Sequence, residues 1–352
     1  MALTLPILPA GVMRKNPNYR RATPEYSQQI RRAFQVGFLA LNVWICIGFY
    51  RWVWFYETGG NGSVPTRPPG VEGWLPIASL MNLKVFLLTG ALPGIHPAGL
   101  FLLLSFIAMC WLLRKSFCSW LCPVGTISEY LWTYGKKTFR RNWRIPRWGD
   151  IALRSLKYIL LGLFLYAVAS MSVGGIKAFL EGPYGVVSDV KMLNFFRYMG
   201  LTGMVVLVVL FLGSVFIQNF WCRYLCPYGA LFGLLSKISP LKIKREVSLC
   251  IDCEKCAKAC PSGLAVDKLI TIGSVECTGC MRCVASCPAE GALHMSIGGG
   301  RKRVPAWAIA AGVAAIFLGV VVIARLTGHW HTNISQSIYM DLVPRANDFS
   351  HP

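Results

Sequence analysis

Long apolar stretches alternate with polar, mostly basic segments along the 352-residue chain. A helix needs about 20 apolar residues to cross the hydrocarbon core of a bilayer. Five stretches approach or exceed that length and predict transmembrane helices at residues 33–56, 97–113, 158–176, 200–221 and 305–324. The pattern therefore favours an α-helical, multi-span membrane protein.

Two further segments, 75–92 and 177–199, are apolar or amphipathic but interrupted by polar residues. Asn82 and Lys84 interrupt the first of them. The pattern alone leaves three arrangements open for each segment: interfacial, re-entrant or spanning. If residues 75–92 spanned the membrane alone, the predicted orientation of everything after them would change.

Composition and charge agree with a membrane protein and give it an orientation. The chain is 55% hydrophobic, with a mean hydropathy of +0.50 and a net charge of +21. Lys and Arg number 28 in segments 1–32, 114–157 and 219–304, against 7 in segments 57–96, 177–199 and 325–352. By the positive-inside rule, the N-terminus is cytoplasmic and the C-terminus is periplasmic in a bacterial inner membrane. Since the basic residues flank apolar spans, the charge does not indicate a nucleic-acid partner.

A repeated cysteine motif carries the clearest chemistry. The spacing C-x2-C-x2-C-x3-C-P occurs twice, first at Cys250, Cys253, Cys256 and Cys260, then at Cys277, Cys280, Cys283 and Cys287. In this motif the fourth cysteine ligates the neighbouring cluster. The expected ligand sets for two [4Fe-4S] clusters are Cys250, Cys253, Cys256 and Cys287 for cluster 1, and Cys277, Cys280, Cys283 and Cys260 for cluster 2. The alternative, structural zinc, ordinarily shows paired C-x2-C units.

These cysteines predict a cytoplasmic, bacterial-ferredoxin-like α+β domain at residues 241–298. The remaining boundaries follow from the apolar pattern and place this domain before the last span. The predicted parts are a basic tail (1–32), a first membrane repeat (33–135), a basic linker (136–157), a second membrane repeat (158–240), the ferredoxin domain, a fifth span (305–324) and an outer tail (325–352).

A second cysteine motif, C-x3-C-P, ends each membrane repeat. Cys118 and Cys122 recur as Cys222 and Cys226 at an offset of 104, which predicts a parallel internal repeat with both motifs on the cytoplasmic face. In a helix, positions i and i+4 are neighbours, and the following prolines would end or kink that helix. The four thiols could hold a third cluster, bind a soft metal such as Cu(I), cycle between dithiol and disulfide, or merely pack.

Together these features resemble the NapH/NosR/CcoG (FixG) group of membrane-bound polyferredoxins over residues 33–325. The segments Arg67–Glu72, His96–Gly99 and Phe220–Ala230 look most similar to YccM-like 4Fe-4S binding proteins. The resemblance implies electron transfer linked to the quinol pool. The chain departs from these relatives in lacking room for NosR's outer flavin-binding domain or CcoG's outer immunoglobulin-like domain, and in adding a span after the ferredoxin domain.

We therefore expect an electron-transfer subunit that works between quinol and a redox protein partner, as part of a quinol-dependent oxidoreductase. Two alternatives stay open: a CcoG-like copper reductase that serves cytochrome oxidase assembly, and a redox-sensing membrane regulator. Arg51, at the outer end of the first span, is a candidate quinone contact, with an interfacial anchor as the simpler interpretation. None of the five histidines lies mid-span, so no pair of haem ligands is predicted.

Overall fold

The computed structural model describes residues 19–23, 25–60, 62–143, 145–298, 300 and 302–351. Most of the predicted basic tail, residues 1–18 with Arg14 and Lys15, lies outside the described residues. The chain forms two compact units. The first, here called the cysteine-rich unit, comprises the described residues within Met1–Gln35, Met109–Leu121 and Phe232–Val313. The second, the helical unit, comprises those within Val36–Ala108, Cys122–Leu231 and Ala314–Pro352.

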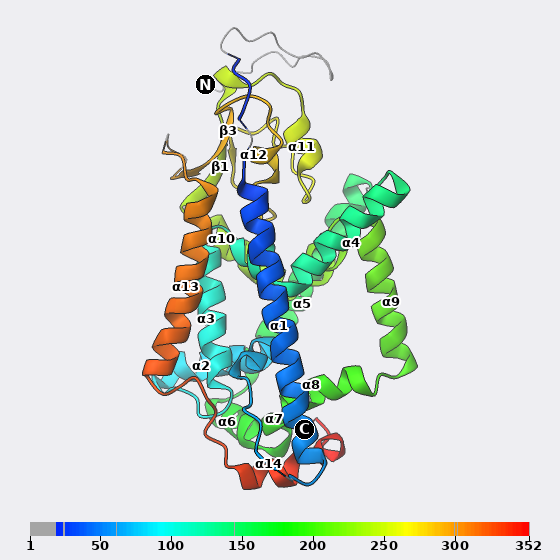
Figure 1. Ribbon diagram of the computed structural model, residues 1–352, viewed down its shortest axis with the longest axis vertical. Coiled ribbons are helices and arrows are strands. Elements are labelled where there is room, and N and C mark those ends of the chain that lie inside the picture. Colours follow the sequence, from blue (N-terminus) through cyan, green and yellow to red (C-terminus); the bar gives the residue numbers. More distant parts are fainter. Residues whose placement is uncertain are drawn as a thin grey trace. The chain divides into compact units, whose positions relative to one another are not determined.

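A small sheet forms the centre of the cysteine-rich unit. The strands β1 (Leu241–Arg245), β2 (Thr271–Ile272) and β3 (Leu293–Ile297) pair antiparallel in the order β2-β1-β3. Figure 1 shows β1 and β3 side by side. Ile243 of β1 stands opposite both Ile272 and Met295, and all three side chains are buried. Two short helices, α11 (Lys255–Ala259) and α12 (Arg282–Ala285), follow the two cysteine-rich loops. This mixture of strands and helices matches the predicted α+β character.

The start of the described chain is part of this unit. The Ala22 amide donates to the carbonyl of Pro288 at 2.9 Å, and the Glu290 amide donates to the carbonyl of Arg20 at 2.9 Å. Arg21 and Ala289 form the antiparallel bridge between these two bonds. Residues 20–22 therefore pair with the backbone segment that directly follows Cys287.

Three helices in the described part of the chain are long and apolar enough to cross a membrane. They are α1 (Ser27–Glu57), α5 (Arg147–Ser170) and α13 (Ala306–Leu326). α9 (Leu201–Phe216) follows α8 (Ser188–Arg197) after a bend of 82°, and the pair would make a fourth span. α3 (Pro97–Leu112) has 16 residues, or about 24 Å of helix. The membrane character is thus supported, while the count of five spans stays a prediction.

The third predicted span is displaced towards the N-terminus. α5 begins at Arg147 and ends at Ser170, whereas the apolar pattern predicted residues 158–176. Its polar first turns are part of the helix because Asp150 finds cationic and hydroxyl partners there. Ser172 then starts a new helix, α6 (Val173–Glu181), by accepting a hydrogen bond from the Gly175 amide at 3.0 Å.

The interrupted segment 75–92 forms the helix α2 (Pro76–Thr89), whose 14 residues give about 21 Å of length. That is shorter than a hydrocarbon core of about 30 Å. Its two polar residues bind neighbouring backbone. Asn82 Nδ2 donates to the carbonyls of Ile95 and His96, and Lys84 Nζ donates to three carbonyls at the end of α5. The polar interruptions are therefore contacts within the protein.

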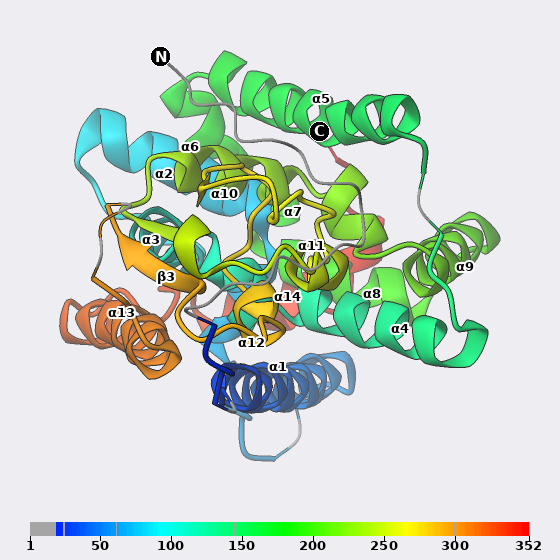
Figure 2. The same cartoon turned by 90° about the horizontal axis from the view of Figure 1, so that it is seen from above.

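Further helices complete the two units. α4 and α9 lie side by side in both views (Figures 1 and 2). The predicted polar tail contains α14, whose Tyr339 packs edge-on against Trp52 of α1 at 4.8 Å. The remaining helices are η1 (Pro69–Trp74), η2 (Phe117–Leu121), α4 (Pro123–Phe139), α7 (Pro183–Val186), η3 (Trp221–Leu225), α10 (Pro227–Lys237), η4 (Val247–Leu249), α14 (Gln336–Leu342) and η5 (Ala346–Asp348).

Candidate metal centres

The eight cysteines of the double motif line two separate hollows in the cysteine-rich unit. One hollow is lined by Cys250, Cys253, Cys256 and Cys287. The other is lined by Cys260, Cys277, Cys280 and Cys283. In each hollow three cysteines come from one motif and the fourth comes from the other. These are the same sets of four that the motif spacing assigns to separate clusters.

The two loops that carry the first cysteines of each motif have the same backbone conformation. Asp252 and Glu254 have positive φ angles of 52° and 57°, and the corresponding Gly279 and Met281 have 64° and 55°. Left-handed residues of this kind turn successive backbone N–H groups into concavities that attract anions. A four-thiolate cluster is such an anion, so the repeated backbone suits a repeated cofactor.

Burial makes these thiols poor acids without a metal. It raises the pKa of Cys256 to about 12 and that of Cys260 to about 11, and it raises the pKa of Cys283 well above its usual value. Neighbouring thiolates add to the effect at all three positions. Bound iron removes this penalty because a coordinated thiol is deprotonated by the metal's charge. The donor set therefore fits an iron–sulfur cluster.

Within the described residues, no three His, Cys, Asp or Glu side chains are placed to hold a single metal ion. A four-iron cluster spreads its ligands more widely than one ion does.

The two C-x3-C-P motifs fold into turns of the same shape. Cys118 lies in the π-helix η2 and Cys122 is the N-cap of α4, while Cys222 lies in the π-helix η3 and Cys226 is the C-cap of η3. All four side chains are partly buried. The following prolines stand at the first turn of α4 and α10, where a missing N–H costs nothing. The expected helical turn is thus a wider π-turn that ends before the proline.

Polar contacts fix the second of these turns inside the helical unit. Arg223 makes two hydrogen bonds of 2.9 Å to the Asp150 carboxylate, and the Tyr224 hydroxyl donates to the same carboxylate at 2.7 Å. The Gly229 amide donates to Cys226 Sγ at 3.2 Å. A hydrogen bond donated to sulfur favours the thiolate form. The sulfur of Cys226 thus accepts a hydrogen bond from the first turn of α10.

Arg51 is exposed on α1, and no hydrogen bond or ion pair joins it to the described residues. The structure gives no contact that distinguishes a quinone ligand from an interfacial anchor at this position. The quinone assignment of Arg51 therefore stays a prediction.

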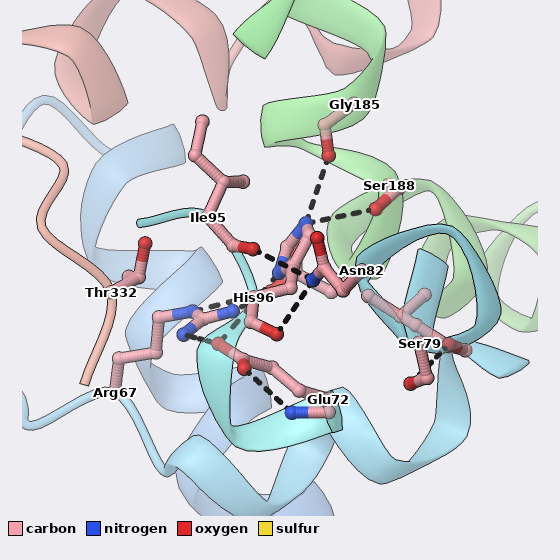
Figure 3. A network of polar contacts seen from close by, with 12 residues as sticks. Arg67, Glu72, Ser79, Asn82, Ile95, His96, Gly185, Ser188 and Thr332 are labelled. Atoms are coloured by element: carbon pink, nitrogen blue, oxygen red, sulfur yellow. Dashed lines mark hydrogen bonds and ion pairs between the residues drawn. The ribbon is translucent and has the colours of Figure 1, made fainter. Parts of the chain in front are cut away.

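A buried polar network in the helical unit was not assigned a role from the sequence (Figure 3). Arg67 binds the Asp189 carboxylate at 2.6 Å and the Glu72 carboxylate at 2.8 Å. His96 Nε2 lies 2.9 Å from the Gly185 carbonyl and 3.2 Å from the Ser188 hydroxyl. Its Nδ1 lies 3.7 Å from Glu72 Oε1, beyond hydrogen-bond distance.

This network carries charges that almost balance. Both carboxylates and His96 are at most 1% exposed. Burial alone would lower the pKa of His96, but the Glu72 carboxylate outweighs it, so the pKa is raised. Burial alone would raise the pKa of Glu72, but Arg67 and His96 outweigh it and the pKa is lowered. One arginine faces two carboxylates, so a proton on His96 makes the group neutral.

A signal for this network was present in the sequence. The chain has only 15 acidic residues, and Glu72 stands among apolar and Gly-Pro residues. His96 immediately precedes the proline that begins an apolar helix. Such isolated ionisable residues beside apolar helices are commonly functional.

Comparisons with known proteins agree with the cysteine chemistry. Residues 95–146 and 199–246 each match the model of a 4Fe-4S binding domain, and residues 242–288 match that of a 4Fe-4S dicluster domain. The first model thus matches a segment around each C-x3-C-P motif. No solved structure matches the chain.

Similar proteins cover most of the chain. YccM of Escherichia coli strain K12, named as a candidate electron transport protein, is 48% identical over 91% of each chain. The ferredoxin-type protein NapH of Haemophilus influenzae is 25% identical over 73% of this chain and 85% of its own. NirI of Paracoccus denitrificans is 31% identical over 60% of this chain and 31% of its own. The chain belongs to the family of membrane polyferredoxin-like, iron–sulfur electron-transfer proteins that includes YccM.

Proposed function

We propose that the protein passes electrons between membrane quinol and a redox protein partner, through two [4Fe-4S] clusters in the cysteine-rich unit. The observation that carries this proposal is the division of eight cysteines into two hollows of four. When bound, each cluster accepts and gives up one electron at a time. The protein's part is to bind the two clusters, shield them from water and keep their cysteines in place.

The chain itself connects the cysteine-rich unit to apolar helices. Residues Met109–Leu121 of that unit continue directly from α3, and β3 leads into α13 after only a short segment. The first C-x3-C-P motif lies at the end of the first connection. We propose that Cys118, Cys122, Cys222 and Cys226 form a further redox or metal centre on the electron path.

The buried network around His96 supports quinol as the membrane partner. A quinol that gives up electrons also gives up protons, and these need an acceptor. His96 and Glu72 are buried ionisable groups whose charge balance changes with one proton. The 28-to-7 distribution of basic residues supports cytoplasmic placement of the N-terminus and clusters and periplasmic placement of the C-terminus.

The test is reduction of the protein by a quinol analogue in nanodiscs, measured by the loss of visible cluster absorbance. We expect Cys226→Ser to leave the clusters of the cysteine-rich unit assembled, because their ligands lie elsewhere, and to slow their reduction. The matched control is Cys46→Ser, which removes an exposed cysteine on α1 that belongs to no motif. Wild-type reduction rates in Cys122→Ser/Cys226→Ser would remove these cysteines from the electron path.

The same preparations test the alternative function in copper handling. If the protein binds copper in a fixed ratio and Cys226→Ser abolishes that binding, the copper reductase alternative is favoured. If quinol does not reduce the wild-type clusters at all, quinol is not the membrane partner.

A further inference from the structure

The two cysteine loops have the same backbone but different surroundings. The loop from Cys277 to Met281 is held by the segment Arg114–Trp120, which follows α3. Ser119 Oγ donates to the Thr278 carbonyl at 2.7 Å, and Trp120 Nε1 donates to the Gly279 carbonyl at 3.4 Å. A Cβ on Gly279 would lie 2.9 Å from the Arg114 carbonyl, so only glycine allows this approach.

Arg114 is buried in an unusual way for a cation. Its side chain is fully inaccessible, and its Nη2 donates to the Ser274 carbonyl at 2.7 Å. Its Nη1 contacts the Ser236 carbonyl at 3.4 Å, and its Nε has no hydrogen-bond partner. No carboxylate pairs with it among the described residues. A buried charge without an opposite charge is strongly disfavoured, so the fold implies an anion nearby.

The anion is indicated by what the guanidinium touches. The Ser274 carbonyl that accepts from Arg114 also accepts from the Cys277 amide at 3.1 Å. Arg114 and the backbone amide of Cys277, a predicted ligand of cluster 2, therefore donate to the same carbonyl. Four thiolates make a bound cluster anionic, and more so after it accepts an electron. The hollow of cluster 2 is lined by residues other than Lys, Arg, Asp and Glu, so none of them compensates the negative charge of a bound cluster.

The other loop has a different electrostatic environment. Arg245 Nη1 lies 3.5 Å from Cys250 Sγ, but it also lies 3.4 Å from the Asp252 carboxylate. Glu254 and Asp267 line the same hollow. Arg245 is thus accompanied by three carboxylates around cluster 1, of which Glu254 also pairs with the exposed Lys258 at 3.5 Å. Negative neighbours disfavour the extra electron of the reduced cluster, whereas a buried cation favours it.

We infer that Arg114 is the internal counter-charge of cluster 2 and gives this cluster a higher reduction potential than cluster 1. This inference rests on the proposed two-cluster site but not on quinol as the donor. It makes cluster 2, whose loop is held by the segment that contains Cys118, the place where an electron resides after one-electron reduction. Arg114 acts as a positioning residue, since it reaches the predicted cluster through the backbone of its loop.

The test is a redox titration of the full chain, purified anaerobically and followed by electron paramagnetic resonance. We expect two separate midpoint potentials in the wild type. Arg114→Gln keeps a donor for the Ser274 carbonyl but removes the charge, so it should shift only the higher potential, and shift it downwards. Arg114→Lys keeps the positive charge, so its higher potential should stay much nearer to the wild-type value. Arg245→Gln should move only the lower potential.

Several outcomes would overturn the inference. A single potential for both clusters in the wild type would do so, as would an Arg114→Gln protein with full iron content and both potentials unchanged. If neither Arg114 variant retains cluster 2, Arg245→Gln decides: movement of the higher potential would contradict the assignment. Failure of quinol to reduce the protein, with the two potentials split as expected, would reject the proposed donor and leave this inference intact.

Discussion

Removing Arg67 should expose how much the buried network contributes to stability. Arg67→Met keeps an apolar stem but leaves two carboxylates, Glu72 and Asp189, buried with only His96 as a possible cation. The side chains of Arg67, Glu72 and Asp189 are 9%, 0% and 1% exposed, so solvent screens the two ion pairs little. Removing one partner of a buried ion pair costs about 3–5 kcal/mol, and the two unpaired carboxylates put this case at the upper end. The unfolding equilibrium should change by about a thousandfold to a few thousandfold.

Equilibrium unfolding in mixed detergent micelles, followed by tryptophan fluorescence, measures this cost. The control is Arg345→Met in the same unit, because Arg345 pairs with Asp341 at 3.3 Å while both are more than half exposed. That change should cost no more than about 1 kcal/mol. Adding Asp189→Asn to Arg67→Met should recover part of the loss, since one carboxylate then faces a protonated His96. A cost for Arg67→Met as small as that of the control, or no recovery in the double variant, would refute the charge argument.

The remaining predictions concern protonation, iron content and membrane orientation. Because the pKa of His96 is raised and that of Glu72 is lowered, both groups should stabilise the fold fully between about pH 4.5 and 6.5, and the contribution of His96 should be lost as pH rises through its pKa. His96→Gln should flatten that alkaline side in unfolding curves measured against pH, and an unchanged profile would contradict this expectation. Anaerobically purified protein should contain about eight iron atoms from two clusters, and Cys256→Ser should damage one cluster more than the other; about four iron atoms in intact protein would reject the two-cluster assignment. A phosphatase fused after residue 340 should be active and one fused after residue 295 inactive, and the reverse result would overturn the predicted orientation.

The cysteine-based part of the molecule could be predicted because its signal is local. Cysteine spacing determines which sulfurs can converge, and the structure brings together the same two sets of four that the spacing suggests. The C-x3-C-P turns were predicted as helical turns ended by proline, and they form π-turns because Cys226 bonds back to Trp221. The family membership inferred from these motifs is confirmed by the similarity to YccM.

The helix boundaries and the buried network depend on distant partners and could not be predicted in the same way. α5 begins before its apolar stretch because Asp150 binds Arg223 and Tyr224, which are far away in the sequence. Arg67 and Asp189 likewise become one ion pair only after folding. Hydropathy treats each of these residues as a polar interruption. It therefore predicts helices that are too short, and it does not show which of these residues pair with one another.

The pairing of residues 20–22 with residues 288–290 has a consequence for biogenesis. Residues 20–22 are synthesised long before their backbone partners, which follow the apolar helices α1, α3, α5 and α9 in the chain. The cysteine-rich unit therefore cannot be completed before these four helices have been synthesised. Its edge closes only once residues 288–290 have been made, so iron delivery to the hollow of Cys287 follows the synthesis of these helices. A fragment limited to residues 241–298 would lack this pairing and should hold cluster 1 less securely than the full chain does.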